Sequence, residues 1–358
     1  RTPASRSLNP KSRAARHSSV LRPLAILLLA LSAAAAQAPL TGDINFYGLR
    51  KLTPDKVLGA IALKPGDPLP PSKGDLEDRL EEIPGVAAAR VEAVCCEGPV
   101  AVLFIGIEER GSPHFDTRPA PIGTATLPED LMSSYRAFMG AVERAAQLGS
   151  AAEDLTAGES RMADPAARAL QDQFAAFATD HLDTLRDVLR NGPEPEERAI
   201  AAAVAGYAPK KNDVIKDLQF ALQDPEPAVR ANAVRALRAI AVLAQKRPEL
   251  NLKIESTWMV AMLNSIALSD RQQAAEALVT LTEQPNAAAL DLIRERALPA
   301  LAEMARWKTL RYALPAFLLL GRTAGIPDQE LQDQWQKGDR ETAIRKATTP
   351  APKPKTTK

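Results

Sequence analysis

Four segments of the chain repeat one pattern, in which arginine stands in second place and an alanine-rich helix follows. They begin at residues 197, 229, 270 and 310 and read ERAIAAAVAGYA, VRANAVRALRAIA, DRQQAAEALVTLT and LRYALPAFLLLGR. In the second segment the apolar side chains of Val229, Ala233, Leu237 and Ile240 form only a thin stripe. A helix cannot bury such a stripe alone, so the repetition predicts that each helix packs on its neighbouring copies.

The spacing of these segments indicates how many helices each repeat contains. Their arginines, Arg198, Arg230, Arg271 and Arg311, lie 32, 41 and 40 residues apart. Partner helices are expected between them, at 213–222, 257–267 and 288–305. A period near 40 with two helices resembles the HEAT repeat, and Asp224-Pro225 before Arg230 resembles the turn typical of that family. The resemblance covers about 194–323, and Pro315 is expected to kink the last helix.

The four arginines allow two interpretations. They could form a charged row that binds a ligand, and Arg198, Arg230, Arg271 and Arg311 are therefore candidate binding residues. The resemblance to HEAT repeats implies instead that arginines in this place pair with acidic side chains of neighbouring repeats.

A different pattern precedes the repeats, between residues 44 and 109. Thr53 and Pro54 are good residues for the start of a helix, and Ser72 or Lys73 opens a second one. Pro84-Gly85 stops the second helix, and the turn at 97–99 joins two apolar strands. The predicted order is strand, helix, helix, strand and strand, at residues 44–47, 54–62, 74–83, 86–96 and 100–109.

This order, together with the motifs INFYGL, LKPGDPL, PGVAAARVE and the closing IEE, resembles a POTRA domain. One departure is Pro84-Gly85-Val86, where many members of that family carry an aromatic residue. The resemblance implies a module that binds other proteins, often by pairing a strand with an exposed sheet edge, and that is not a catalyst.

The two closing strands have apolar side chains on both faces, although a three-stranded sheet with helices on one side should leave its other face open. Ala89, Val91, Leu103, Ile105 and Ile107 are expected to pack on the two helices. The opposite face provides four candidate binding residues, Val94, Cys96, Val102 and Phe104. We predict that this face is covered by the segment around Phe115 and Ile122, by the repeats or by a partner protein. Internal cover is favoured because the following segment is adjacent in sequence.

The N-terminus has the composition of a secretory signal. Basic residues without acids (1–22) precede a short apolar stretch (23–36) and an Ala-Gln-Ala sequence. We expect residues 1–38 to direct secretion across the inner membrane, into the periplasm, with cleavage after Ala34, Ala36 or Ala38. An uncleaved anchor is the alternative.

The remaining segments complete the predicted organisation. After the small domain (39–110) comes an extended linker (111–128), then a helical domain (129–345) and a disordered basic tail (346–358) that could contact anionic lipid or wall polymer. Within the helical domain we expect a helix over 129–148 and another capped by Asp164. The adjacent Cys95 and Cys96 are expected to be reduced thiols rather than a vicinal disulfide.

Few residues suggest chemistry. The 45 basic and 44 acidic residues nearly cancel and aromatics are only 4%, which argues against nucleic-acid binding. His114, Asp116 and His181 have the ligand types of a metal site but no known spacing, and His181 is expected in a helix core. The Glu108-Glu109 pair is expected in solvent. No nucleotide-binding or hydrolase motif occurs.

The sequence therefore predicts an α+β protein, with a small N-terminal POTRA-like domain and an all-α HEAT-like solenoid. The expected function is a non-enzymatic scaffold for protein–protein interaction in the cell envelope, with no cofactor. Its protein partners and oligomeric state stay open. The alternatives are a metal-dependent enzyme using His114, Asp116 and His181, or a structural envelope linker acting through the Lys-rich tail after Lys346.

Overall fold

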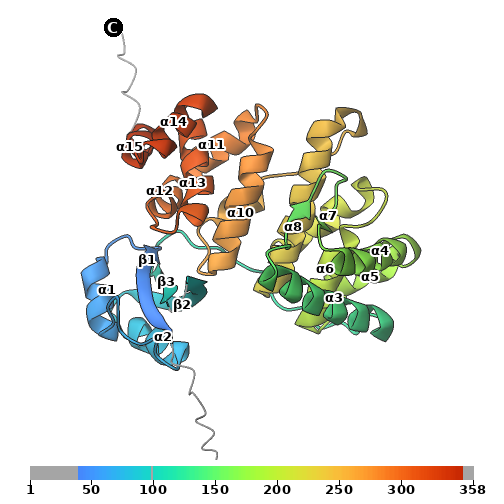
Figure 1. The fold of residues 1–358 in the computed structure, drawn as a ribbon, viewed down its shortest axis with the longest axis horizontal. Helices are drawn as coiled ribbons and strands as arrows, with labels where there is room; N and C mark the ends of the chain where they lie inside the picture. Colours follow the sequence, from blue (N-terminus) through green and yellow to red (C-terminus); the bar gives the residue numbers. More distant parts are fainter. Residues whose placement is uncertain (1–38, 98–99, 350–358) are drawn as a thin grey trace, which may run out of the picture. The chain divides into compact units, whose positions relative to one another are not determined.

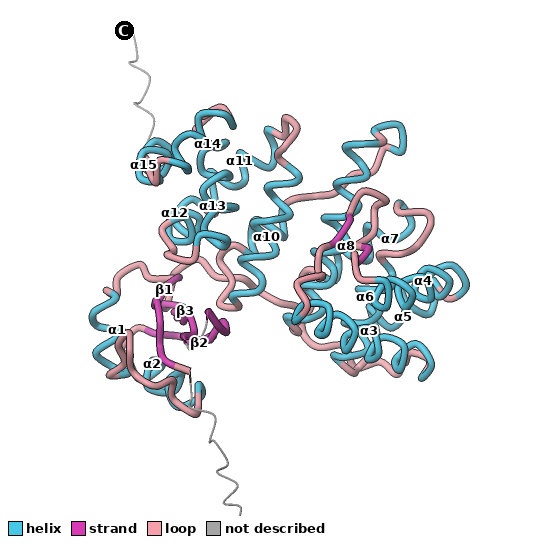
Figure 2. The backbone as a smooth tube through the Cα atoms, in the orientation of Figure 1, coloured by secondary structure: helices cyan, strands magenta, loops and turns pink. Residues whose placement is uncertain are grey.

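The computed structural model describes residues 39–97 and 100–349, without the side chains of 95–97. The expected signal segment, the side chains of Cys95 and Cys96, and residues 350–358 of the expected tail therefore lie outside the described residues. The described residues belong to one compact unit. A small mixed sheet is followed by a long series of helices (Figures 1 and 2), which confirms the α+β class. Within the described ranges, no helix has the length and apolar character needed to cross a membrane.

The small domain has the predicted order of elements. It consists of β1 (Leu40–Tyr47), α1 (Pro54–Ile61), α2 (Lys73–Glu81), β2 (Val86–Glu97) and β3 (Val100–Glu109). The hydroxyl of Thr53 accepts a hydrogen bond from the Lys56 amide at 3.4 Å, and that of Ser72 accepts one from the Asp75 amide at 3.2 Å. Both predicted helix starts are therefore capped by side chains, which supply partners for otherwise unpaired amides.

The sheet has the order β1-β3-β2, with β3 parallel to β1 and antiparallel to β2. Because side chains alternate along a strand, Leu103, Ile105 and Ile107 share one face of β3. They form a core with Val57 and Leu80 of the two helices. This confirms the face that was predicted to pack on the helices and leaves Phe104 on the opposite face.

Thirteen helices longer than one turn follow in the described chain, besides the two-residue strands β4 (Glu153–Asp154) and β5 (Arg161–Met162) and a 3-10 turn at Pro248–Leu250. They are α3 (Glu129–Gln147), α4 (Pro165–Asp180), α5 (Leu182–Asn191), α6 (Pro195–Ala205), α7 (Asn212–Ala221), α8 (Pro227–Lys246), α9 (Thr257–Met262), α10 (Leu268–Leu281), α11 (Ala287–Arg296), α12 (Leu298–Ala305), α13 (Leu310–Thr323), α14 (Asp328–Gln336) and α15 (Arg340–Thr348).

The arginine-bearing helices α6, α8, α10 and α13 pack one on the next, and α5, α7, α9 and α12 pack on them as partners (Figure 1). Small residues bring these helices together, as the alanine-rich pattern predicts. A Cβ atom added to Gly206 would lie 2.8 Å from the Cβ of Ala236. The contact between Gly206 and Ala236 therefore has no space for a larger side chain at either position.

Three local expectations were wrong or incomplete. The helix predicted over 288–305 is divided into α11 and α12 at Ala297, next to Pro299, which fits only the first turn of a helix. The helix after Asp164 ends at Asp180, so His181 lies exposed between α4 and α5 rather than in a core. Helix α13 continues through Pro315, as the sequence pattern predicts, and the kink expected there stays a prediction. Residues 346–348, expected to be disordered, belong to α15.

Residues 111–128 contain no helix or strand, yet they are bound along the repeats; we call them the strap. The Arg118 amide donates to the Gln223 carbonyl at 2.7 Å, and the guanidinium lies 3.3 Å from the Phe220 ring centroid. Further along, the Leu127 amide donates to the Glu197 carboxylate at 2.5 Å. The strap therefore follows the ends of helices α7 and α6 instead of hanging free.

Candidate functional site

The first two repeat arginines form buried ion pairs with acids of the next repeat. Arg198 donates to the two oxygens of Asp224 at 2.9 and 3.0 Å. Arg230 donates to Asp270 at distances from 2.7 to 3.1 Å. Each also donates to the carbonyl six residues before it, Gly192 at 3.0 Å and Asp224 at 2.6 Å. Both arginines are buried, so they join repeats and do not face solvent.

The third arginine, Arg271, departs from this pattern. It is buried and donates to the Ser265 carbonyl six residues earlier at 2.6 Å. Its nearest carboxylate, that of Glu303, lies 4.0 Å away, and its Nη1 has no hydrogen-bond partner among the described atoms. Its guanidinium lies 4.7 Å from the ring centroid of Tyr47, which belongs to the small domain. Burial lowers the pKa of Arg271 to about 10.

The fourth arginine, Arg311, does not take the place that the repeat pattern predicts. It is exposed, lies 4.6 Å from the ring centroid of its neighbour Tyr312, and makes no ion pair within the described chain. The carbonyl six residues earlier, of Ala305, accepts instead from Arg340 of α15 at 2.7 Å. Arg230 pairs with Asp270, the residue directly before the next repeat arginine. The corresponding residue for Arg271 is Leu310, so the last repeat offers Arg271 no acid at that position.

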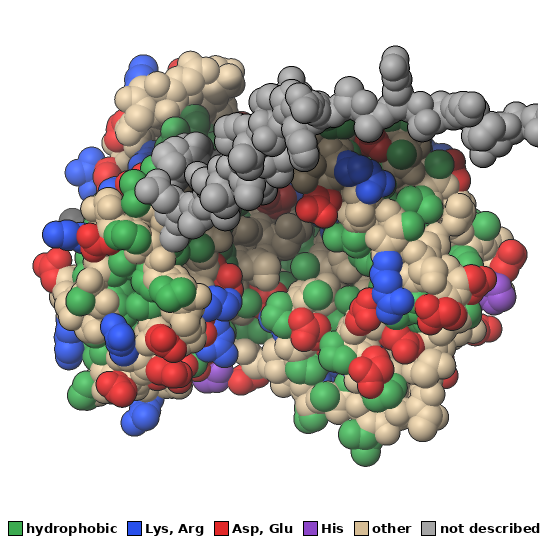
Figure 3. Space-filling model, turned by 60° about the horizontal axis from the view of Figure 1, so that its bottom comes forward, with side chains coloured by type: hydrophobic (Ala, Val, Ile, Leu, Met, Phe, Trp, Pro, Cys, Tyr) green, Lys and Arg blue, Asp and Glu red, His purple; other side chains and the backbone are tan. Residues whose placement is uncertain are grey.

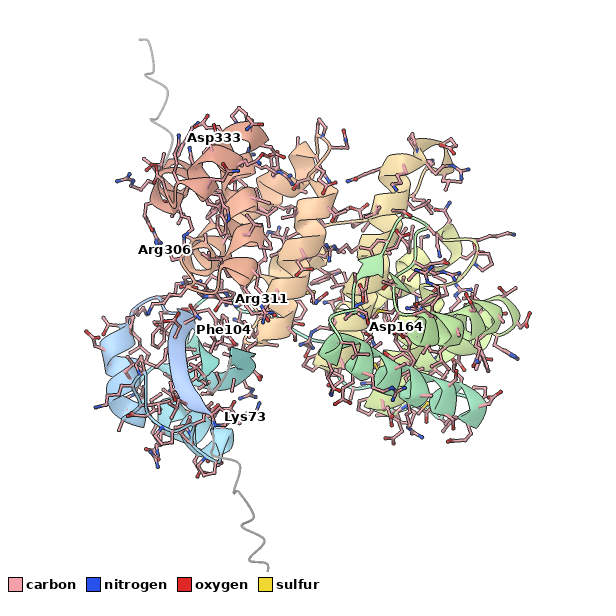
Figure 4. The ribbon with its side chains drawn as sticks, in the orientation of Figure 1. Lys73, Phe104, Asp164, Arg306, Arg311 and Asp333 are labelled. Atoms are coloured by element: carbon pink, nitrogen blue, oxygen red, sulfur yellow. The ribbon has the colours of Figure 1, made fainter. Side chains whose placement is uncertain are left out.

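The sheet face opposite the helices is covered by the last repeats. Phe104 is fully buried and makes edge-to-face contacts with Trp307 at 5.0 Å and Tyr312 at 5.5 Å, measured between ring centroids. Figure 4 shows Phe104 on the sheet, near the start of α13 where Arg311 lies. Internal cover was therefore the right expectation, but the repeats supply it.

The remaining members of the predicted face have different environments. Val94 and Val102 are half-buried against the same core as Phe104, and Phe115 also packs on that core. Ile122 is 97% exposed and covers nothing. The side chain of Cys96 lies outside the described residues.

Polar contacts join β1 to the segments around α10, α12 and α13. The Tyr47 hydroxyl donates to the Ile266 carbonyl at 2.9 Å, and the Trp307 indole nitrogen donates to the Phe46 carbonyl at 2.9 Å. The Lys308 amide donates to Asn45 at 2.8 Å, and the Lys308 ammonium pairs with Asp43 at 3.0 Å. We call this contact between β1, with the Phe104 face of the sheet, and residues 266–312 the docking interface.

Two carboxylates bind the loop at 48–52, which follows β1. Glu303 of α12 accepts from the Gly48 amide at 2.9 Å and pairs with Arg50. Glu109 accepts from the amides of Arg50, Lys51 and Leu52 at 2.8 to 3.0 Å. Glu109 was expected in solvent but is 4% exposed, because its position at the end of β3 places it under this loop.

The environments of these carboxylates shift their pKa values in opposite directions. Burial raises the pKa of Glu303, although Arg271 and Arg50 oppose it. Burial also acts to raise the pKa of Glu109, but the amides of Arg50, Leu52 and Lys51 outweigh it and hold that pKa below its ordinary value. Of these two carboxylates, Glu109 is therefore the one that stays charged to lower pH.

Both edges of the sheet have backbone groups that are already hydrogen-bonded. On β1 the Thr41 amide donates to the Asp67 carbonyl at 2.7 Å, and the Phe46 carbonyl accepts from Trp307. On β2 the amides of Ala89 and Val91 donate to Glu81 and Glu77 of α2 at 3.0 and 2.8 Å, and the Ala89 carbonyl accepts from Arg90 at 2.6 Å. These side chains occupy backbone groups that another strand would need.

The edge at β1 lies along a groove of about 400 Å³. Its apolar side comes from the small domain and its charged side from α12 and the residues after it. The groove is lined by Ile44, Asn45, Phe46, Leu49, Leu52, Pro54, Glu303, Arg306, Trp307 and Lys308. The solenoid side of the groove was not predicted from the sequence. The available signal was the rarity of aromatic residues, 4% of the chain, which sets Trp307 apart from its neighbours.

The proposed metal ligands are not brought together. The His114 Nε2 atom lies 3.1 Å from Asp116 Oδ1, but the described ranges contain no group of three His, Cys, Asp or Glu residues able to hold a metal ion.

A cavity beside Tyr135, Ser160 and Asn232 measures about 30 Å³, room for one or two water molecules. On the face seen in Figure 3, basic and acidic side chains are mixed and hydrophobic ones are scattered among them.

Comparison with known proteins supports the interpretation of the helical part. The HEAT repeat family matches residues 182–250, which span α5 to α8 and the 3-10 turn after them. Arg198 and Arg230, the arginines of the two buried Arg–Asp pairs, both lie within this match. No curated protein matches the chain. The structure shows a small mixed sheet followed by a helical solenoid, and residues 182–250 of that solenoid match HEAT repeats.

Proposed function

We propose that the protein is a non-enzymatic scaffold of the cell envelope, in which a POTRA-like domain and a HEAT-like solenoid together bind a partner protein. The observation that carries this proposal is the groove between β1 and α12, because neither part forms it alone. Helical repeats present extended surfaces, and binding between proteins is their usual use.

The chemistry of the groove suits an extended segment of a partner protein. Leu49 and Leu52 offer apolar contacts on one side, and Arg306 and Lys308, which pair with Glu341 and Asp43, carry positive charge on the other. The resemblance to POTRA domains favours recognition beside a sheet edge.

Site-specific photo-crosslinking in the cells that make the protein tests this proposal. A photoreactive residue at Leu52 should form a discrete adduct with another protein. The same residue at Met139, which is 49% exposed on α3, is the matched control. The adduct should weaken when Leu49→Asp is added. Equal labelling at both positions, or none at Leu52, contradicts a partner site in the groove.

The envelope location rests on the composition of residues 1–38, a basic stretch followed by a short apolar one. Fractionation of cells that express the chain with and without these residues measures it. The chain with them should be recovered outside the cytoplasm. Recovery of both forms in the cytoplasm contradicts the proposal on location and leaves the groove to be tested separately.

The non-enzymatic character is tested against the metal-dependent alternative. Metal analysis of the purified protein should find no stoichiometric ion. An ion bound in a one-to-one ratio, and lost on replacing His114 and His181 with alanine, would establish the alternative. Truncation after Thr349 tests the tail alternative, since an unchanged fractionation removes it.

A further inference from the structure

The docking interface contains buried polar atoms that have no hydrogen-bond partner in the described chain. Four buried side-chain atoms in it have no hydrogen-bond partner among the described atoms: Thr41 Oγ1, Asn45 Nδ2, Arg271 Nη1 and Thr309 Oγ1. The guanidiniums of Arg198 and Arg230, in contrast, are bound by carboxylates and carbonyls. Unpaired buried polar atoms weaken a contact. The repeats also contain such atoms, among them Arg238 Nε and Gln272 Nε2, so what distinguishes the docking interface is the incompletely paired guanidinium of Arg271.

Glu303 is shared between two sets of partners. In the repeat pattern Arg198 and Arg230 each have an acid of the next repeat, and Glu303 is the carboxylate nearest to Arg271, at 4.0 Å. Its oxygens are instead taken by the Gly48 amide and by Arg50. A cavity of about 10 Å³ lies beside Arg271, lined also by Gly48 and Glu109. In the docked state Arg271 therefore keeps only a long ion pair with Glu303, at 4.0 Å, while Gly48 and Arg50 hold the same carboxylate more closely.

We propose that the small domain is a releasable cap on the solenoid, and that Glu303 is the residue that changes partners. In the docked state Glu303 binds Gly48 and Arg50. In the released state it pairs with Arg271 as Asp224 pairs with Arg198 and Asp270 with Arg230. Because release lets Glu303 close the 4.0 Å gap to Arg271, part of the free energy lost on breaking the interface is returned.

Release would uncover a specific surface. Phe104 and Tyr47 on the sheet, and Trp307 on the solenoid, are buried only in the contact between the two parts. These rings would then form apolar patches able to bind another protein. The strap stays bound to α6 and α7 through Leu127 and Arg118, so the small domain remains tethered beside its docking site.

Hydrogen–deuterium exchange on the full chain measures release, since β1 amides exchange when the interface opens. Glu303→Ala should raise exchange in peptides covering 44–48 and 303–312 by about 10- to 100-fold, the factor expected for loss of charged hydrogen bonds. Peptides of α6 and α8 should be unchanged. The control is Glu276→Ala, which removes a half-buried Arg238–Glu276 pair at 2.6 Å between α8 and α10.

A second variant separates release from ordinary loss of an interface residue. Arg271→Gln removes the partner that Glu303 gains in the released state, so exchange in 44–48 should stay at or below the wild-type rate. Loss of the contact between the Arg271 guanidinium and the Tyr47 ring, 4.7 Å from its centroid, acts in the opposite sense, so the proposal requires the loss of the Glu303 partner to outweigh it. Faster exchange in Arg271→Gln, as large as in Glu303→Ala, overturns the proposal, as does wild-type exchange in Glu303→Ala. Neither measurement depends on a partner protein, so the proposed function and the cap can fail independently.

Discussion

Neighbouring residues of β3 point to opposite faces, and this allows one sharp test of what holds the small domain in place. Phe104 is fully buried against Trp307 and Tyr312 of the solenoid. Ile105 is equally buried but packs inside the small domain, against α1 and α2. Truncation of either to alanine should therefore destabilise the full chain, but only Ile105 should matter to residues 39–110 alone.

The magnitudes follow from the burial of each side chain. In the full chain Phe104→Ala should cost about 3–5 kcal/mol of unfolding free energy, the range for a buried phenylalanine, part of it from the two edge-to-face contacts. In the isolated domain these rings are missing, so the change should stay within about 0.5 kcal/mol, as at a surface site. Ile105→Ala should cost about 2–5 kcal/mol in both.

Urea unfolding followed by circular dichroism measures these changes, provided that the slope of free energy against urea stays constant within each pair. Dye binding to the isolated wild-type domain should exceed that to the full chain, because Phe104 is then uncovered. The reasoning is refuted if Phe104→Ala destabilises the isolated domain as strongly as the full chain, or leaves the full chain unchanged.

Three further predictions concern the repeats and the loop after β1. Asp270→Asn leaves the buried Arg230 without its charged partner and should cost about 3–5 kcal/mol in urea melts, whereas Arg311→Asn should stay within about 0.5 kcal/mol; equal effects would contradict the assignment of Arg311 to solvent. Ala236→Leu should cost about 1–3 kcal/mol by overpacking against Gly206, and an unchanged melting temperature would argue against close packing. The pKa of Glu109 is lowered in the folded chain, so its stabilisation is present above its ordinary pKa near about 4.3 and is lost as pH falls through the lower folded value. Glu109→Gln should therefore destabilise the chain at pH 7 and not at pH values below that folded pKa; a difference independent of pH would exclude this carboxylate as the source.

Features that repeat or alternate could be predicted from the sequence, because each residue carries part of the signal. The alanine-rich helices, the spacing of Arg198 and Arg230, and the apolar face around Phe104 are of this kind. The sequence also indicated the helix starts at Thr53 and Asp164, where the residue types at the first turn supply a local physical reason.

Contacts made by one residue from a distant part of the chain could not be predicted in this way. Arg340 replaces Arg311 at the Ala305 carbonyl from the next helical pair, and no pattern relates their positions. Glu303 belongs to a repeat by sequence but binds Gly48 and Arg50 of the small domain. Glu109 was expected in solvent because its position at the end of a strand did not reveal the loop above it.

The central claim is that the small domain docks on the last repeats of its own chain, and one ion pair across the interface reports on it directly. Lys308 and Asp43 lie 3.0 Å apart and both are accessible. A carbodiimide, which joins only amines and carboxylates already in contact, should give an Asp43–Lys308 crosslinked peptide in the monomer fraction. Lys73 and Glu92, 3.5 Å apart within the small domain, provide the internal control. Recovery of both peptides is the predicted result; the Lys73–Glu92 peptide without the Asp43–Lys308 peptide would contradict the docked arrangement.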